Sequence, residues 1–178
     1  MREQYKRPYL DSTIFIGWIK NEVVDGVERG KIADHVLKLA EAGTFQVYTS
    51  ALTIAEVHKR KRGPTLTEKE NETILKYFEN EFIQIIDVDR SIGEEANALC
   101  RKYSAQGLWP IDAIQMACAR RGGCDVLLSW DKTINGIKDF EVPTEEPQII
   151  GQPALPLTQE KRLLLEMKNG ANAQDKKS

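Results

Sequence analysis

Four acidic side chains lie in apolar stretches of the sequence, where an unpaired charge is costly. Asp11 follows a short apolar run near the N-terminus, and Glu56 lies among alanines, leucine and isoleucine. Asp112 is the only charge before Arg120 in an otherwise apolar helical pattern, and Asp131 follows an apolar run that ends at Trp130. Because aspartate and glutamate are rarely buried without a partner, all four are candidates for chemistry.

Each of these residues also has a purely structural interpretation. Asp11 could cap the helix that follows it, or Ser12 could cap it instead, and Asp131 could cap the turn after it. Asp112 lies in a first helical turn, where a carboxylate suits the macrodipole. Glu56 could pair with a basic residue one turn further on. Taken singly, the aspartates favour these structural roles.

Strand-like runs alternate with helical patterns along the chain. Strands are predicted at 8–11, 45–49, 82–88 and 125–130, and helices at 12–20, 29–42, 52–62, 67–81, 91–106 and 111–121. This alternation is typical of an α/β domain with a mostly parallel sheet.

The predicted sheet brings the four carboxylates to one place. In an open parallel sheet, the carboxyl ends of strands and the helix N-termini that follow them gather at one edge, where ligands bind. Four carboxylates there would raise one another's pKa unless a cation intervened. Oxygen ligands without nearby histidine or cysteine favour Mg²⁺ or Mn²⁺. Such an ion can activate water and stabilise an attacked phosphate, so the pattern indicates metal-assisted phosphodiester hydrolysis.

The composition is that of an ordinary globular protein. The 178 residues include 41% hydrophobic and 29% charged residues with a net charge of −2, so any surface for nucleic acid must be local. Three cysteines without C-x-x-C spacing and two histidines argue for reduced thiols and against a zinc site. The apolar run near the N-terminus is too short for a membrane span and has no signal-peptide cleavage pattern. We expect a cytoplasmic protein without a membrane partner.

The C-terminal part differs in character from the rest. We expect a domain at residues 1–142 and an extension at 143–178. Four of the seven prolines lie between 143 and 156. A short helix is predicted at 158–169, followed by a disordered tail.

Four motifs occur in the order seen in PIN-domain nucleases, and the sequence resembles the VapC-type toxins among them. The motifs are Leu10-Asp11-Ser12-Thr13, then Thr49-Ser50-Ala51-Leu52-Thr53-Ile54-Ala55-Glu56, then Asp112-Ala113-Ile114-Gln115-Met116-Ala117, and finally Ser129-Trp130-Asp131. Together they cover roughly residues 8 to 140.

The resemblance implies a three-layer α/β/α sandwich, a Mg²⁺ or Mn²⁺ site, and ribonuclease activity on an RNA substrate. It also implies a homodimer held by a cognate antitoxin. By this resemblance, Asp11 and Asp112 are the main metal ligands, and Glu56 and Asp131 complete the acidic site. The chain is longer than the usual short toxin by the segment after about residue 141.

Two basic runs are candidates for binding RNA. Lys59, Arg60 and Arg62 end the helix that carries Glu56, and Arg120 ends the helix begun by Asp112. Cations are favoured at helix C-termini in any case, so a structural role stays open.

Two tryptophans could contribute to the same surface. Trp109 and Trp130 each neighbour a candidate acid, and either could stack a nucleobase or pack in the core.

Two other functions compete with the nuclease. The first is a catalytically silent PIN-like scaffold that binds RNA or a protein. The second is a phosphatase with Asp11 as nucleophile, similar to the haloacid-dehalogenase superfamily. That group has a second aspartate two residues on, followed by a glycine–threonine pair, and Asp11-Ser12-Thr13-Ile14 has neither.

Overall fold

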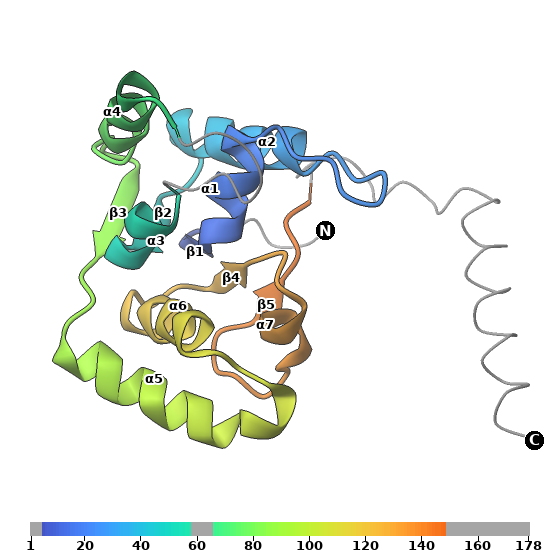
Figure 1. Cartoon of the computed structure of the whole chain (residues 1–178), viewed down its shortest axis with the longest axis vertical. Helices are drawn as coiled ribbons and strands as arrows, with labels where there is room; N and C mark the ends of the chain where they lie inside the picture. The colour runs from blue at the N-terminus through green and yellow to red at the C-terminus, as the bar shows by residue number, and fades with distance from the viewer. Residues whose placement is uncertain (1–4, 58–65, 149–178) are drawn as a thin grey trace, which may run out of the picture. The chain divides into compact units, whose positions relative to one another are not determined.

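Five short parallel strands form the centre of the fold (Figure 1). The structure is a computed structural model and describes residues 5–57 and 66–148. Within these residues the strands are β1 (Pro8–Leu10), β2 (Val47–Ser50), β3 (Ile83–Ile86), β4 (Val126–Leu128) and β5 (Thr144–Glu145). Their order in the sheet is β3-β2-β1-β4-β5, and every pairing is parallel. The predicted parallel sheet is confirmed.

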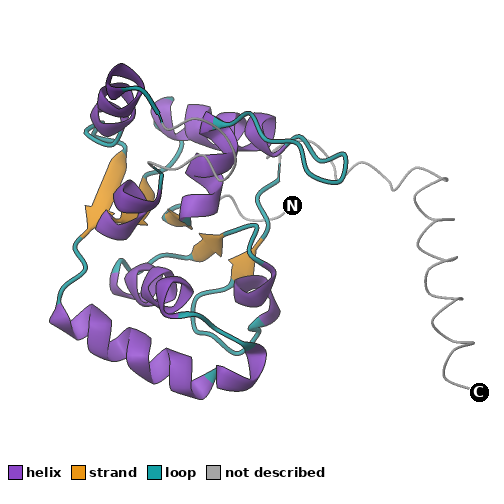
Figure 2. Ribbon diagram, in the orientation of Figure 1, coloured by secondary structure: helices purple, strands orange, loops and turns teal. Residues whose placement is uncertain are grey.

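Helices connect the strands (Figure 2). Within the described ranges they are α1 (Ser12–Ile19), α2 (Arg29–Glu41), α3 (Ala51–Glu56), α4 (Glu68–Tyr77), α5 (Arg90–Lys102), α6 (Pro110–Arg121) and α7 (Lys132–Gly136), with a short 3₁₀ turn at Ser104–Gln106. Helices α1 and α2 lie on one side of the strands, and α5 and α6 on the other (Figure 1). This arrangement confirms the three-layer α/β/α sandwich.

Local sequence signals set several helix boundaries. A capping box forms at the start of α4, where Thr67 and Glu70 bond to each other's backbone amides. Ser50 caps α3 by accepting a hydrogen bond from the Thr53 amide, and Pro110 occupies the first turn of α6. These caps matter for function because α3 and α6 carry Glu56 and Asp112.

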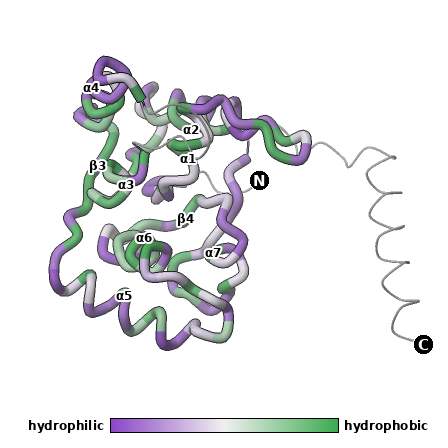
Figure 3. The backbone as a smooth tube through the Cα atoms, in the orientation of Figure 1, coloured by the Kyte–Doolittle hydropathy of each residue, from purple (hydrophilic) through white to green (hydrophobic). Residues whose placement is uncertain are grey.

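The core beneath the sheet is formed largely by α5, α6 and α7 packed against β1 and β4. Helix α6 buries a nearly continuous run from Gln115 to Ala119, and α5 contributes Ile92, Ala96 and Leu99. Figure 3 shows the difference: α6 is largely hydrophobic, whereas hydrophilic residues recur along α5. Buried on nearly all sides, α6 holds its N-terminal turn in a defined position at the sheet edge.

The strand order places a switch point beside β1. From β1 the chain moves outward through β2 to β3, and then returns to the other side of β1 to add β4 and β5. In open parallel sheets, ligands bind outside the carboxyl ends of the strands at such a switch point. The ends of β1 and β4 therefore mark the expected place of the functional site.

Two elements were not predicted from the sequence. Strand β5 has only two residues, follows Pro143 directly, and lies in the segment that we assigned to the C-terminal extension. Residues 144–145 thus pair with β4 in the sheet, because Leu127 and Leu128 offer an unpaired edge. Helix α7 forms where a turn was predicted after Asp131. The predicted helix at 158–169 and the tail lie outside the described residues.

The three cysteines are free thiols, as predicted. Cys118 and Cys124 are buried, and Cys100 is partly exposed. No helix within residues 5–57 and 66–148 combines the length and the apolar character that crossing a membrane requires.

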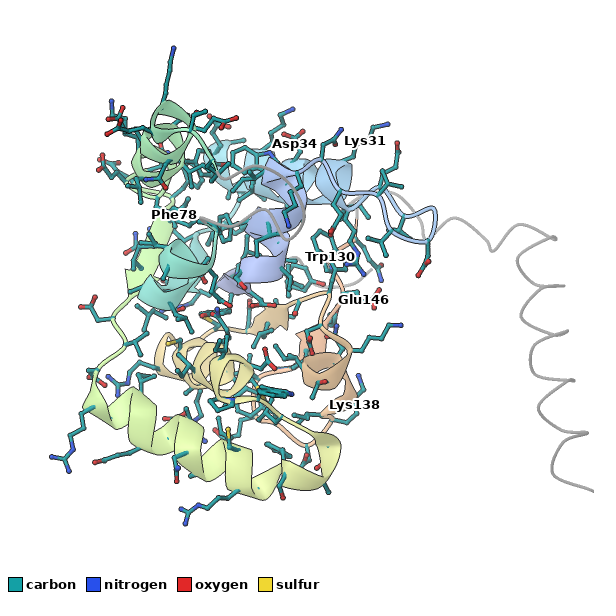
Figure 4. All side chains as sticks on the ribbon, viewed as in Figure 1. Lys31, Asp34, Phe78, Trp130, Lys138 and Glu146 are labelled. Atoms are coloured by element: carbon teal, nitrogen blue, oxygen red, sulfur yellow. The ribbon has the colours of Figure 1, made fainter. Side chains whose placement is uncertain are left out.

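A glycine in α1 fixes how closely this helix approaches Trp130. A methyl group at Gly17 would lie 2.7 Å from Cζ3 of the Trp130 ring, which is labelled in Figure 4. We expect Gly17→Ala to destabilise the chain by about 1–3 kcal/mol, because the packed indole must shift. Gly93→Ala is the matched control: it is also helical, has nothing within 4 Å of the added carbon, and should be neutral or stabilising. Urea denaturation of both variants measures the difference, and equal midpoints would contradict the close contact.

Candidate active site

Asp11 lies at the carboxyl end of β1 with its side chain almost fully buried. Only 3% of the residue is exposed. Its Oδ2 accepts hydrogen bonds from the hydroxyls of Ser129 at 2.6 Å and Thr13 at 2.9 Å, and its Oδ1 accepts one from Ser12 at 3.3 Å. Burial raises the pKa of Asp11, although these hydrogen bonds act in the opposite direction. The carboxylate is held firmly, and in an environment that disfavours its charge.

Asp11 does not cap α1 with its side chain. It occupies the N-cap position, but no amide of the first turn donates to its carboxylate in a capping bond. The alternative that Ser12 caps the helix is wrong as well, because Ser12 is the first helical residue. The carboxylate is instead oriented by three hydroxyls and by the backbone amide of Ser12.

Asp131 does act as a helix cap. Its Oδ1 accepts hydrogen bonds from the amides of Thr133 at 2.7 Å and Ile134 at 3.0 Å. These two bonds cap the start of α7. The Asp131 amide donates to the Ser129 hydroxyl at 2.9 Å, and this same hydroxyl donates to Asp11. Ser129 therefore links the two aspartates that follow β1 and β4.

Asp112 lies in the first turn of α6 and is half-buried. Burial, followed by the charges of Asp131, Asp11 and Glu56, raises the pKa of Asp112 to about 6. A backbone hydrogen bond from Trp109 acts in the opposite direction. The other three predicted acids each contribute to the field at Asp112, so all four lie in the same region of the fold.

Glu56 ends α3 and is also half-buried. Its Oε2 accepts a hydrogen bond of 2.8 Å from Nε2 of Gln115, and Ser12 supplies a second one. Burial is the main cause of its raised pKa, and the charge of Asp11 adds to it. The Ser12 hydroxyl therefore lies within reach of both Asp11 and Glu56, and its single proton is donated to one carboxylate at a time.

Gln115 was not recognised from the sequence, although it organises the floor of the site. It is fully buried. Its Oε1 accepts hydrogen bonds from the hydroxyls of Tyr9, of Ser50 at 3.1 Å and of Thr53 at 3.4 Å. With the amide oxygen so occupied, the amide nitrogen is turned toward Glu56. Its position, one turn after Asp112 in an apolar helix, was the signal that could have revealed it.

The donor set fits a hydrated divalent cation better than a tightly chelated one. Within the described ranges, no three side chains among His, Cys, Asp and Glu are placed to hold a metal ion together. Mg²⁺, however, commonly binds through one or two carboxylates and keeps several waters. Close to Ser129, Oδ1 of Asn135 is buried and has no hydrogen-bond partner in the described part of the chain. One buried oxygen without a partner and carboxylates with raised pKa values are side chains that an oxygen-coordinated cation would stabilise.

The structure does not bring Arg120 to the acids. Its guanidinium pairs with Glu95 at 2.8 Å and with Glu141 at 3.4 Å. Eight residues of helix separate it from Asp112, about 12 Å along the axis of α6. RNA binding by Arg120 stays a prediction that these ion pairs do not support. Lys59, Arg60 and Arg62 lie outside the described residues.

The two tryptophans beside the acids have different environments. Trp130 is 5% exposed and packs against Gly17, with the Arg29 guanidinium 5.2 Å from its ring centre, so core packing is the correct interpretation for it. Trp109 is 72% exposed, so core packing is excluded for this residue.

Comparison with known proteins agrees with this fold. A protein-family model described as the PIN domain matches residues 9–139, most of the chain. The match spans all four acidic positions. The chain belongs to the PIN domain family.

Solved structures share the fold at low sequence identity. A toxin–antitoxin complex from Klebsiella pneumoniae is similar at 22% identity and a TM-score of 0.53, covering 73% of this chain and 92% of that one. VapC20 of Mycobacterium tuberculosis, a Sarcin-Ricin loop cleaving toxin, is similar at 15% identity and a TM-score of 0.56, covering 72% and 93%. FitAcB from Neisseria gonorrhoeae is similar at 16% identity and a TM-score of 0.52, covering 79% and 97%. No curated protein matches the chain in sequence.

Proposed function

We propose that this chain is a cytoplasmic, Mg²⁺- or Mn²⁺-dependent endoribonuclease that hydrolyses RNA phosphodiester bonds. The observation that carries the proposal is the acidic site at the switch point. There, burial and three neighbouring carboxylates raise the pKa of Asp112 to about 6. A bound cation relieves the repulsion among neighbouring carboxylates, and side chains that offer only oxygen ligands favour Mg²⁺ or Mn²⁺.

The four acids have two proposed roles. Asp11 and Asp112 are the proposed metal ligands, and Glu56 and Asp131 complete the negative field around them. A divalent ion bound here supplies the positive charge that stabilises a phosphodiester under attack by water. The hydroxyls of Ser12, Thr13 and Ser129 hold Asp11 in place, so its carboxylate need not reorganise when substrate arrives.

We also propose that the chain is the toxin of a toxin–antitoxin pair and acts as a homodimer. The support is the shared fold with VapC20 and with the toxin–antitoxin complex of Klebsiella pneumoniae. The boundary of the nuclease domain near residue 142 belongs to this proposal. So does the role of residues 143–178 as an extension, apart from the β5 strand already in the sheet.

An RNA-cleavage assay tests the proposal. The full chain, purified free of any bound protein, is incubated with a mixture of structured RNAs and with Mn²⁺ or Mg²⁺, beside an EDTA control. Cleavage that requires the ion is the expected result. Intact RNA in every reaction would favour the silent scaffold instead. Hydrolysis of p-nitrophenyl phosphate that is lost in Asp11→Asn would favour the phosphatase.

A further inference from the structure

Trp109 is the most exposed of the large hydrophobic side chains in the described part of the chain. Its exposure is 72%, whereas Trp130 is only 5% exposed. Trp18, the third tryptophan, stacks 4.5 Å from the Tyr77 ring and donates to Asp34. Within the described residues the Trp109 ring makes no aromatic contact, cation–π contact or hydrogen bond. A large indole held in solvent costs free energy that a bound partner would recover.

The backbone of Trp109 is anchored next to Asp112 at the start of α6. Trp109 is the N-cap residue of α6 in an extended conformation, with φ −85° and ψ 153°. Leu108 before it is buried, and Pro110 after it starts the helix. A backbone hydrogen bond from Trp109 reaches Asp112 itself. The ring therefore stands on a rigid segment, one helical turn from a proposed metal ligand.

The apolar surface here suits a small flat partner better than a second protein. Ile111, 47% exposed, is the exposed large apolar neighbour of Trp109. An aromatic side chain can bury about 150–250 Å², and one further aliphatic residue adds little to that. A stable protein interface buries about 800 Å² on each partner. The exposed pair by itself covers far less area than such an interface, and it is large enough for one nucleobase.

We propose that Trp109 stacks an unpaired nucleobase of the RNA whose neighbouring phosphate lies at Asp112. Stacking is open to every base because every base has a π face, and it requires that the base be unpaired. The assignment rests on the proposed ribonuclease function and adds to it a preference for single-stranded or looped RNA. It also gives the acidic site an attractive contact with RNA that is independent of charge.

Binding of uncleaved RNA tests this assignment. The full chain carrying Asp112→Asn is titrated with a fluorescent single-stranded RNA, and with the same sequence as a duplex, in Mg²⁺. Adding Trp109→Ala should weaken single-strand binding by about ten- to a hundredfold, while Trp109→Phe should retain most of it. Duplex binding should change little. Val23→Ala, at a residue 61% exposed between α1 and α2, is the matched control and should leave affinity unchanged.

The outcomes separate this assignment from the proposed function. If the wild type cleaves RNA but Trp109→Ala changes neither single-strand affinity nor KM, the stacking role is wrong and the nuclease stands. If Trp109→Ala instead converts a dimer to a monomer in sedimentation, with RNA affinity retained in the monomer, the ring belongs to a protein interface and the assignment is wrong. If the wild type neither binds nor cleaves RNA, both proposals fall.

Discussion

Asp112→Asn is expected to reduce RNA cleavage by about 10²–10⁴-fold and, without divalent ions, to make the folded chain more stable at pH 7. The two effects have one cause. The carboxylate that the reaction needs is half-buried among three others, and its ionisation works against folding. Loss of function with gain of stability is the combination expected of a functional residue, whereas a structural carboxylate would lose stability.

The pH dependence follows from the raised pKa of Asp112. Its pKa is 3.8 in an ordinary environment and about 6 in the folded chain. The folded state therefore holds its proton more tightly, and this contribution to stability is fully present below about pH 3.8. It is lost as the pH rises through about 6. The full shift corresponds to about 3 kcal/mol, which solvent screening at a half-buried group reduces to about 1–2 kcal/mol.

Thermal unfolding in EDTA measures this effect. At pH 7.5 the Asp112→Asn chain should melt about 2–6 °C above the wild type, and the difference should vanish near pH 4. Asp139→Asn is the matched control, because Lys102 lowers the pKa of Asp139 and its neutralisation should give no such gain. A variant that melts at or below the wild type at pH 7.5 would show that Asp112 is not under electrostatic stress.

Gln115→Met is expected to cost about 2–5 kcal/mol of stability and to lower RNA cleavage by about 10- to 100-fold. Methionine has a similar length, but its thioether sulfur is a poor acceptor for the hydrogen bonds of the Tyr9, Ser50 and Thr53 hydroxyls. These buried donors therefore lose a strong partner. Glu56 at the same time loses the 2.8 Å hydrogen bond that orients it. One substitution should therefore loosen both the floor of the site and one of its acids.

Urea denaturation and cleavage kinetics at a temperature where the variant stays folded separate the two effects. Gln106→Met is the matched control, since Gln106 is exposed in the 3₁₀ turn and should be replaceable without loss. If folded Gln115→Met cleaves RNA at the wild-type rate, Glu56 does not depend on Gln115 for its position.

The acids were predictable from the sequence because each lies in an apolar run, and burial makes a carboxylate conspicuous. The alternation of strands and helices then placed all four acids at one edge of a parallel sheet, and that sheet is confirmed. Asp131 shows that the two interpretations need not compete. It caps α7 through Oδ1 and still contributes its charge to Asp112.

The supporting residues were harder to predict because their role depends on contacts between distant parts of the chain. Gln115 reaches Tyr9, 106 positions away, and Ser129 reaches Asp11 across 118 positions. No local pattern encodes such pairs. Strand β5 was missed for another reason: two residues after a proline carry no periodic signal, and only pairing with β4 defines them.

Titration of the chain with Mn²⁺, monitored by calorimetry or electron paramagnetic resonance, is the most direct test of whether the acidic site binds a divalent cation. The wild-type chain at pH 6 should bind Mn²⁺ with release of protons, because Asp112 is partly protonated there before the ion binds. Asp11→Asn and Asp112→Asn should each weaken binding by about tenfold or more, and Asp139→Asn should not. Equal Mn²⁺ affinity in the wild type and in both acidic-site variants would contradict the assignment of this site as a metal centre.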